Sequence, residues 1–184
     1  MSSRTPAAAA AAAPQTVDAA GLALGVAVLA TGLMAGLFYA YACSVMPGLA
    51  KASDRTALEA MQRINTAIMN PVFFAGFLGA PAAALVALVL EHRDGAGPVA
   101  RWVLAGLVLY GVVVVVTGAA NVPLNDELAR ADLSRQGTDL AALRDRFEDT
   151  WVLWNVVRTV ACVAAFGCLG RALMLHGQSV IAAE

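Results

Sequence analysis

Five residues of one apolar stretch could do chemistry on a bound molecule. Trp151, Trp154, Asn155, Arg158 and Cys162 follow the spacing i, i+3, i+4, i+7 and i+11, which places them on one stripe of an α-helix. A guanidinium and an amide there could stabilise a negatively charged oxygen, and indole rings could stack on a planar ring. An arginine that reaches back to the membrane surface, beside tryptophans of the interfacial aromatic belt, would explain the same residues without a function.

Further polar residues are predicted at the same end of the helical elements. Tyr41 ends the first apolar segment, asparagines precede the second, and others follow the third. Because the chain alternates sides, these residues share one membrane face, whereas His92 and His176 lie on the opposite face. We therefore predict a site with catalytic residues Arg158, Asn155, Asn65, Asn121 and Asp126, and substrate-binding residues Tyr41, Asn70, Asn125, Trp151 and Trp154.

A general base for this site is sought among nearby acids. Asp126 is the first candidate because it follows Pro123 at the mouth of the third helix, and Asp149 and Glu148 are alternatives. The same acids could instead face solvent in a loop or form a salt bridge to Arg158.

The composition is typical of a membrane protein. Hydrophobic residues make up 60% of the 184 residues and charged residues only 14%. A net charge of −1 with scattered Lys and Arg gives no basic patch, so nucleic acid is not an expected partner. The three cysteines have no CxxC spacing and are expected to be buried small hydrophobic residues.

Four segments are long and apolar enough to cross a bilayer, which takes about 20 apolar residues. They are residues 19–42, 71–90, 102–120 and 152–175. Strands are excluded as spanning elements because an open sheet edge leaves backbone groups unpaired in lipid. The sequence thus predicts an all-α, integral membrane four-helix bundle, multi-pass in the cell membrane, with the lipid bilayer as its main partner.

The bundle is expected to form one domain over residues 19–175. Residues 1–18 are rich in alanine and are expected to form a disordered tail, and residues 176–184 a C-terminal tail. A signal peptide is the alternative for the N-terminus. The apolar core that follows the tail is longer than a signal-peptide core, which favours a retained helix.

Two long connections are predicted on the face that holds the site. In the first, Leu58, Met61, Ile64 and Ile68 recur at helical spacing after a capping Ser53, which predicts an amphipathic helix at the interface. The second is expected to break at Pro123 and then form polar helical turns that cover the bundle end.

The sequence resembles the anthrone oxygenases, a group of small four-helix membrane proteins. The segments that carry the resemblance are YACSVMPGLA, AMQRINTAIMNPVF, NVPLNDEL and WVLWNVVRT, within residues 22–172. The resemblance implies oxidation of an anthrone to an anthraquinone by O2, with no recognised metal or organic cofactor.

The residues themselves agree with cofactor-free chemistry. A metal oxygenase needs histidine and carboxylate ligands, and both histidines lie on the wrong face. We therefore expect no cofactor and a hydrophobic or aromatic small molecule that forms a stabilised carbanion or phenolate. The alternative is a non-catalytic membrane protein that binds a lipid, a quinone or a partner membrane protein at the same pocket. A third function, transport, would need a dimer to form a path, and a homo-oligomer is therefore also considered as a partner.

Overall fold

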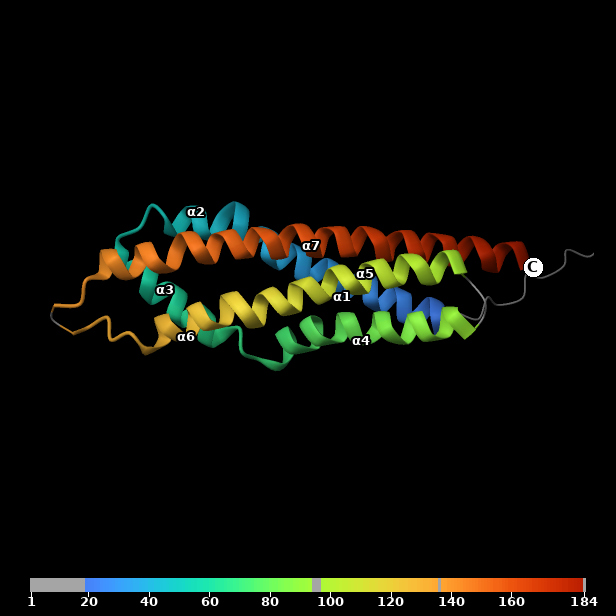
Figure 1. Cartoon of the computed structure of the whole chain (residues 1–184), viewed down its shortest axis with the longest axis horizontal. Helices are drawn as coiled ribbons and strands as arrows, with labels where there is room; N and C mark the ends of the chain where they lie inside the picture. Colours follow the sequence, from blue (N-terminus) through green and yellow to red (C-terminus); the bar gives the residue numbers. More distant parts are fainter. Residues whose placement is uncertain (1–18, 94–96, 136, 184) are drawn as a thin grey trace, which may run out of the picture.

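The chain folds into helices that lie side by side along one axis (Figure 1). The computed structural model describes residues 19–93, 97–135 and 137–183, and this part of the chain holds no strand. The four long helices are α1 (Ala19–Ala40), α4 (Pro71–Arg93), α5 (Gly97–Val116) and α7 (Leu140–Ala183). Helices α1 and α5 each pack against both α4 and α7. The predicted all-α membrane bundle is confirmed, and the predicted tail over residues 1–18 lies outside the described residues.

Two π-helical turns extend α1 and α5 beyond the predicted segments. Helix α1 continues through η1 (Tyr41–Val45) and α2 (Met46–Leu49), and α5 continues through η2 (Thr117–Asn121) and α6 (Val122–Arg130). The predicted break at Pro123 is therefore wrong. A proline ring collides with the carbonyl group four residues earlier in an α-helix, and the wider π-helical turn that precedes Pro47 and Pro123 relieves this contact.

The predicted amphipathic helix in the first connection is confirmed as α3 (Asp54–Ala67). The backbone N–H of Thr56 donates to Ser53 Oγ at 3.3 Å, so Ser53 caps the helix as expected. Leu58 and Met61 are buried against α7 and α6 in the cap, a cluster of buried residues beyond the polar end of the bundle. The cap consists of Met46, Leu58, Met61, Leu128, Leu133, Leu143, Phe147 and Trp151.

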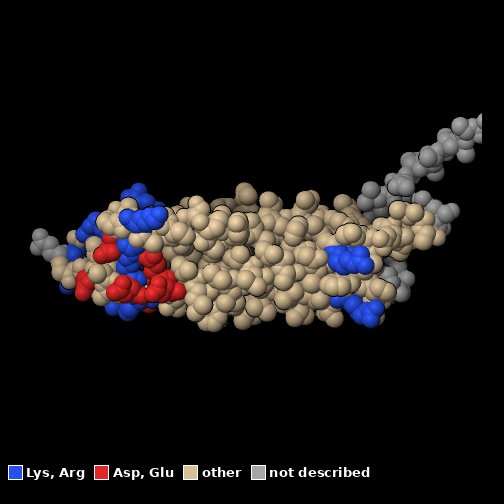
Figure 2. Space-filling view, turned by 90° about the horizontal axis from the view of Figure 1, so that it is seen from above, with Lys and Arg blue, Asp and Glu red and all other residues tan. Residues whose placement is uncertain are grey.

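The outer surface of the bundle is apolar over most of its length. On the face that Figure 2 shows, Lys, Arg, Asp and Glu gather toward one end and Lys or Arg lie toward the other, with an uncharged band between them. Four helices are long and apolar enough to cross a membrane, and exposed side chains such as Leu29 and Val160 suit contact with lipid. This is a multi-pass membrane protein. Of the three cysteines predicted to be buried, Cys162 is buried, Cys168 is half-buried and Cys43 is exposed on η1. The prediction is therefore wrong for Cys43, because contact with lipid satisfies a small apolar side chain as well as a core does.

Helix α7 faces the bundle through a regular seam. Its buried residues recur at intervals of four and three, the heptad spacing that keeps one face toward neighbouring helices. The first three members of this seam are large and carry polar atoms, and the later ones are less polar and mostly small. In order they are Trp151, Asn155, Arg158, Cys162, Ala165, Leu169 and Ala172.

The closest approach of α5 to α7 lies at Gly106. A Cβ atom at Gly106 would meet Leu169 Cγ at 2.8 Å and the carbonyl oxygen of Ala165 at 3.3 Å. Gly106→Ala is therefore expected to destabilise the protein by about 1–3 kcal/mol, because the buried Leu169 side chain must leave its packed position or α7 must shift. Thermal unfolding of purified protein measures the effect. Gly111→Ala, on the same helix with open space around it, is the control and should not lower the melting temperature.

Candidate functional site

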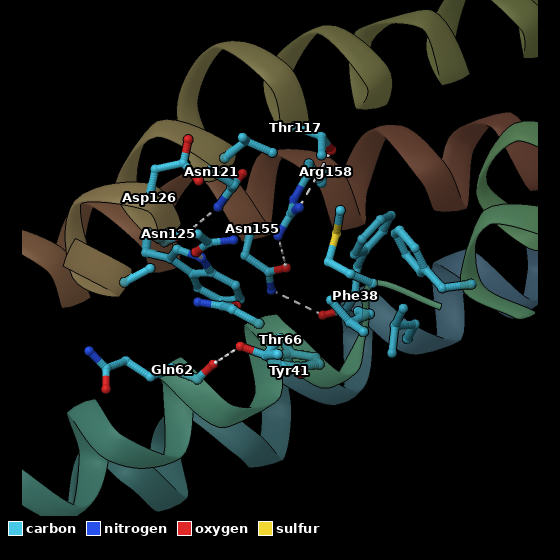
Figure 3. Close-up of a pocket in the computed structure, with 18 residues that line it drawn as sticks. Phe38, Tyr41, Gln62, Thr66, Thr117, Asn121, Asn125, Asp126, Asn155 and Arg158 are labelled. Carbon is cyan, nitrogen blue, oxygen red and sulfur yellow. Dashed lines mark hydrogen bonds between the residues drawn. The ribbon is translucent and has the colours of Figure 1, made fainter. Parts of the chain in front are cut away.

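A cavity of about 380 Å³ lies at the polar end of the bundle (Figure 3). Its walls come from α1, α3, the start of α4, the continuation of α5 and the upper part of α7. The lining residues are Leu37, Phe38, Tyr41, Gln62, Asn65, Thr66, Ile68, Met69, Phe73, Thr117, Asn121, Val122, Asn125, Asp126, Ala129, Trp151, Asn155 and Arg158.

The cavity brings together most of the residues that the sequence predicts for the site. All five predicted catalytic residues line it, and so do three of the five predicted substrate-binding residues. Asn70 and Trp154 do not. Asn70 caps α4 instead, since its Oδ1 accepts hydrogen bonds from the backbone N–H groups of Val72 and Phe73, both at 3.0 Å. Trp154 lies off the heptad seam of α7 and is only half-buried.

Arg158 is the main charged group of the cavity. Its side chain is 6% exposed, and no carboxylate among the described residues forms a salt bridge to it. Its Nη2 donates to Asn155 Oδ1 at 2.9 Å and its Nη1 to Thr117 Oγ1 at 3.5 Å, while no described residue accepts from Nε. The predicted alternative of a salt bridge between Arg158 and a nearby acid is therefore wrong.

Aromatic rings complete the surroundings of the guanidinium. Arg158 Cζ lies 4.6 Å from the ring centroid of Phe38 and 5.4 Å from that of Trp151, within the range of cation–π contacts. The negative faces of the two rings attract the cation, but they carry no net charge and do not neutralise it. A buried cation without a counter-ion is costly in a membrane protein, and an anionic ligand would supply the missing charge.

Two asparagines stand beside Arg158 with opposite hydrogen-bonding states. Both polar atoms of Asn155 have a partner, because its Oδ1 accepts from Arg158 and its Nδ2 donates to the carbonyl oxygen of Phe38 at 3.1 Å. Asn121 is half-satisfied: its Nδ2 donates to the carbonyl oxygen of Trp151 at 3.3 Å, but its buried Oδ1 accepts from no described residue. Unpaired buried polar atoms are rare and call for an explanation, which a bound polar molecule would provide.

The π-helical turn η2 decides which residue of the third helix faces the cavity. The buried residues of α5 include Tyr110 and Val113, so a regular seam would continue to Thr117 and Ala120. The wider turn adds one residue, and Asn121 takes the inward position while Ala120 is only half-buried. This local widening places an amide opposite Arg158, as Figure 3 shows.

Trp151 forms one wall of the cavity and is fixed from two sides. Its Nε1–H donates to Asn125 Oδ1 at 2.8 Å, and its ring lies 5.6 Å from that of Tyr41, centroid to centroid. Because the indole N–H is already satisfied, the ring offers the cavity its apolar faces. A planar aromatic molecule could stack there beside the guanidinium.

Helix α3 forms the outer wall of the cavity. One glutamine and one arginine hold it in place through hydrogen bonds. Gln62 Nε2 donates to the carbonyl oxygens of Leu128 and Ala131 at the end of α6. Arg144, on the part of α7 beyond the bundle, donates to the carbonyl oxygens of Leu49 and Ala52 and to Asp54 at the start of α3. The cavity therefore depends on contacts far from Arg158.

The three candidate bases are placed differently. Asp126 lines the cavity at its exposed rim. Glu148 forms a salt bridge with Arg144, and Asp149 is exposed and does not line the cavity. Over the described ranges, no group of three or more His, Cys, Asp or Glu side chains could hold a metal ion.

Sequence reasoning missed several residues of the cavity, of which Phe38 and Thr117 matter most for Arg158. Both could have been found from helical spacing. Phe38 stands three residues before Tyr41, and Thr117 four before Asn121, so each pair shares a helix face. Apolar lining residues such as Met69 and Phe73 carry no sequence signal that separates them from ordinary lipid-facing or core residues.

Comparison with known proteins supplies a family. The model of the anthrone oxygenase family matches residues 67–168, more than half of the chain. The matched range holds Asn121, Asn155 and Arg158, whereas Tyr41 and Asn65 lie before it. Searches of curated proteins and of solved structures found no match. The predicted resemblance is confirmed, and the chain belongs to the anthrone oxygenase family.

Proposed function

We propose that the protein oxidises a planar aromatic substrate with O2, and that the substrate is bound in the cavity as a phenolate or enolate anion. The observation that carries the proposal is the burial of Arg158 without a carboxylate partner among the residues that the structure describes. Trp151 and Phe38 offer apolar faces for the rings, and Arg158 and Asn121 offer polar atoms for the oxygen substituents. Membership in the anthrone oxygenase family supports the same reaction class.

The proposed reaction needs no redox partner other than O2. A CH2 group between two aromatic rings loses a proton to a base, and the resulting carbanion is stabilised as an enolate whose oxygen faces Arg158. Electron transfer to O2 and formation of a C–O bond give a hydroperoxide, which loses water to leave a carbonyl group. One oxygen atom ends in the product and the other in water, so the four electrons of the CH2 group reduce one O2.

In this proposal the protein contributes proton transfer and electrostatic stabilisation. Arg158, held by Asn155 and Thr117, stabilises the enolate before and during electron transfer. The apolar residues around Arg158 lower the local dielectric constant, which strengthens that interaction. Asp126 is the proposed base, because it is the acid that the cavity lining contains.

Oxygen uptake by protein in lipid vesicles tests the function. With anthrone as substrate, we expect uptake of one O2 per anthrone consumed and formation of anthraquinone. Addition of catalase should release no O2, because the reaction forms no hydrogen peroxide. A metal chelator should not slow the uptake. Uptake no faster than in protein-free vesicles would reject the oxidation. The planar phenol 1-naphthol then serves as a binding probe. If it still bound saturably to the protein, a ligand-binding function would replace the proposed oxidation.

Loss of the proposed base is expected to slow turnover moderately. Asp126→Asn should lower the rate of oxygen uptake about tenfold, at the low end for general bases, because Asp126 is exposed and water can take over part of its role. Asp149→Asn is the matched control, since Asp149 is equally an exposed acid but lies outside the cavity. Equal rates for the two variants would remove Asp126 from the mechanism.

A further inference from the structure

The opening of the cavity is confined to one side of the protein. Among the lining residues, all the exposed ones belong to the end of α3, the short connection to α4, or the segment that begins at Val122. They are Thr66, Met69, Val122, Asp126 and Ala129. The lining residues from α1 and α7 are buried or half-buried and form the floor. The cavity therefore opens between the α3–α4 connection and α6.

The opening has a polar edge and an apolar edge. Thr66 and Asp126 supply the polar edge, while Met69 and Val122 are apolar and adjoin the spanning helices, since Met69 stands two residues before α4 and Val122 follows η2 at the end of α5. Met69 is 65% exposed and Val122 is 43% exposed. Val122 stands one helical turn before Asp126, and Met69 leads into the first turn of α4, where Val72 is exposed. Large exposed apolar side chains at this edge of the opening, such as Met69 and Val122, suit contact with hydrocarbon better than contact with water.

We propose that the ligand enters the cavity laterally from the bilayer, through the opening bordered by Met69 and Val122. The entering molecule is a planar, membrane-soluble acid in its neutral form, which gives up its proton only beside Arg158. Ionisation at that point fits the geometry, because Arg158 lies on the floor and Asp126 at the polar edge of the opening. The inference rests on the cavity being a ligand site, as proposed above, but not on oxidation.

The charge distribution supports entry of the neutral form. An anion that approached from the bilayer would lose its hydration before reaching any cation, at a cost of several kcal/mol. A neutral acid of the same shape partitions into the bilayer and loses little on entering an apolar opening. Arg158 then favours the ionised form only inside the cavity, which retains the ligand.

Fluorescence of Trp151 reports on this route without any knowledge of the natural substrate. Trp151 is 4% exposed and forms a wall of the cavity, so lipid reaches it through the opening and not at the outer surface. Trp102→Phe and Trp154→Phe leave Trp151 as the single tryptophan. The protein is placed in vesicles of phosphatidylcholine brominated at carbons 6 and 7 of the acyl chain, near the polar boundary, where bromine quenches tryptophan on contact.

The expected result is strong quenching of Trp151 that falls at least twofold when Val122→Phe narrows the opening. Val115→Phe is the matched control: it makes the same change at a 66% exposed valine of α5 that does not line the cavity, and quenching should not change. If Val122→Phe does not fold, Met69→Phe narrows the opposite edge. Quenching that is insensitive to both substitutions, or quenching by aqueous iodide but not by the brominated lipid, would overturn the proposal. Oxygen uptake is not measured, so the two proposals fail independently.

Discussion

Oxygen uptake with anthrone is expected to fall about 10²- to 10³-fold when Arg158 is replaced by leucine. The physical reason is that Arg158 is a buried cation of the cavity, and no carboxylate in the described part of the chain neutralises it. Leucine fills a similar apolar volume but cannot stabilise an enolate. The measurement is the initial rate of O2 consumption per protein in lipid vesicles, at saturating anthrone.

The control for this substitution lies on the same helix. Arg171→Leu removes an exposed arginine from the opposite end of α7, outside the cavity, and should leave the rate within about twofold of the wild-type rate. Arg158→Lys keeps the charge but loses the planar fork that contacts Asn155 and Thr117, so it should recover only part of the activity.

A purely structural role for Arg158 predicts a different result. Removing the guanidinium leaves Asn155 Oδ1 without its donor, which costs about 1–3 kcal/mol. It also removes a buried charge, which acts in the opposite direction. We therefore expect a melting temperature close to that of the wild type. A large drop in melting temperature together with unchanged turnover in the remaining folded protein would assign Arg158 to the fold alone.

The long helices could be predicted from the sequence because the membrane imposes a length and a composition on them. The amphipathic helix α3 was equally accessible, since a serine cap precedes apolar residues at helical spacing. The continuation of the α5 helix through Pro123 could not be predicted from the sequence. A proline in a polar stretch normally ends a helix, and only the π-helical turn over Thr117–Asn121 shows how the chain avoids that end.

The two tryptophans of α7 show how far spacing alone can locate a site. Trp151 and Trp154 both fit a broad stripe with Asn155 and Arg158, yet only Trp151 lines the cavity. The difference is the heptad interval, because Trp151 stands four residues before Asn155 and seven before Arg158. A narrow seam of this kind would have separated them. For Asn70, the following Pro71 is a signal of a helix start, which favours capping over binding.

Contacts between distant segments could not be predicted, and Arg144 is the clearest case. It lies on the polar side of a segment rich in charged residues of both signs, next to the buried Leu143. In the structure it joins the extension of α7 to residues about ninety positions earlier in the chain. Such a role depends on the tertiary structure, and no local sequence pattern indicates it.

Arg144→Ala is expected to destabilise the cap and to loosen the outer wall of the cavity. The substitution removes hydrogen bonds to the carbonyl oxygens of Leu49 and Ala52 and leaves Glu148 and Asp54 without their cation. The arginine is largely buried, so the cost should be roughly 2–3 kcal/mol. That corresponds to amide exchange in α3 that is about 30- to 150-fold faster.

Hydrogen exchange of the amides of α3 measures this effect where it should be greatest, and the amides of α5 provide an internal reference. Arg146→Ala is the matched control, because Arg146 stands two residues away on the same helix. Its salt bridge to Glu127 differs from that of Arg144: both side chains are exposed, and Arg146 Nε lies 3.8 Å from Glu127 Oε1. An exposed pair of that length contributes about 0–1 kcal/mol, so exchange in α3 should stay within about fivefold of the wild type. Equal exchange in the two variants would mean that α3 is held by its apolar contacts in the cap. The cavity wall would then be independent of Arg144, and Arg144→Ala should leave oxygen uptake unchanged.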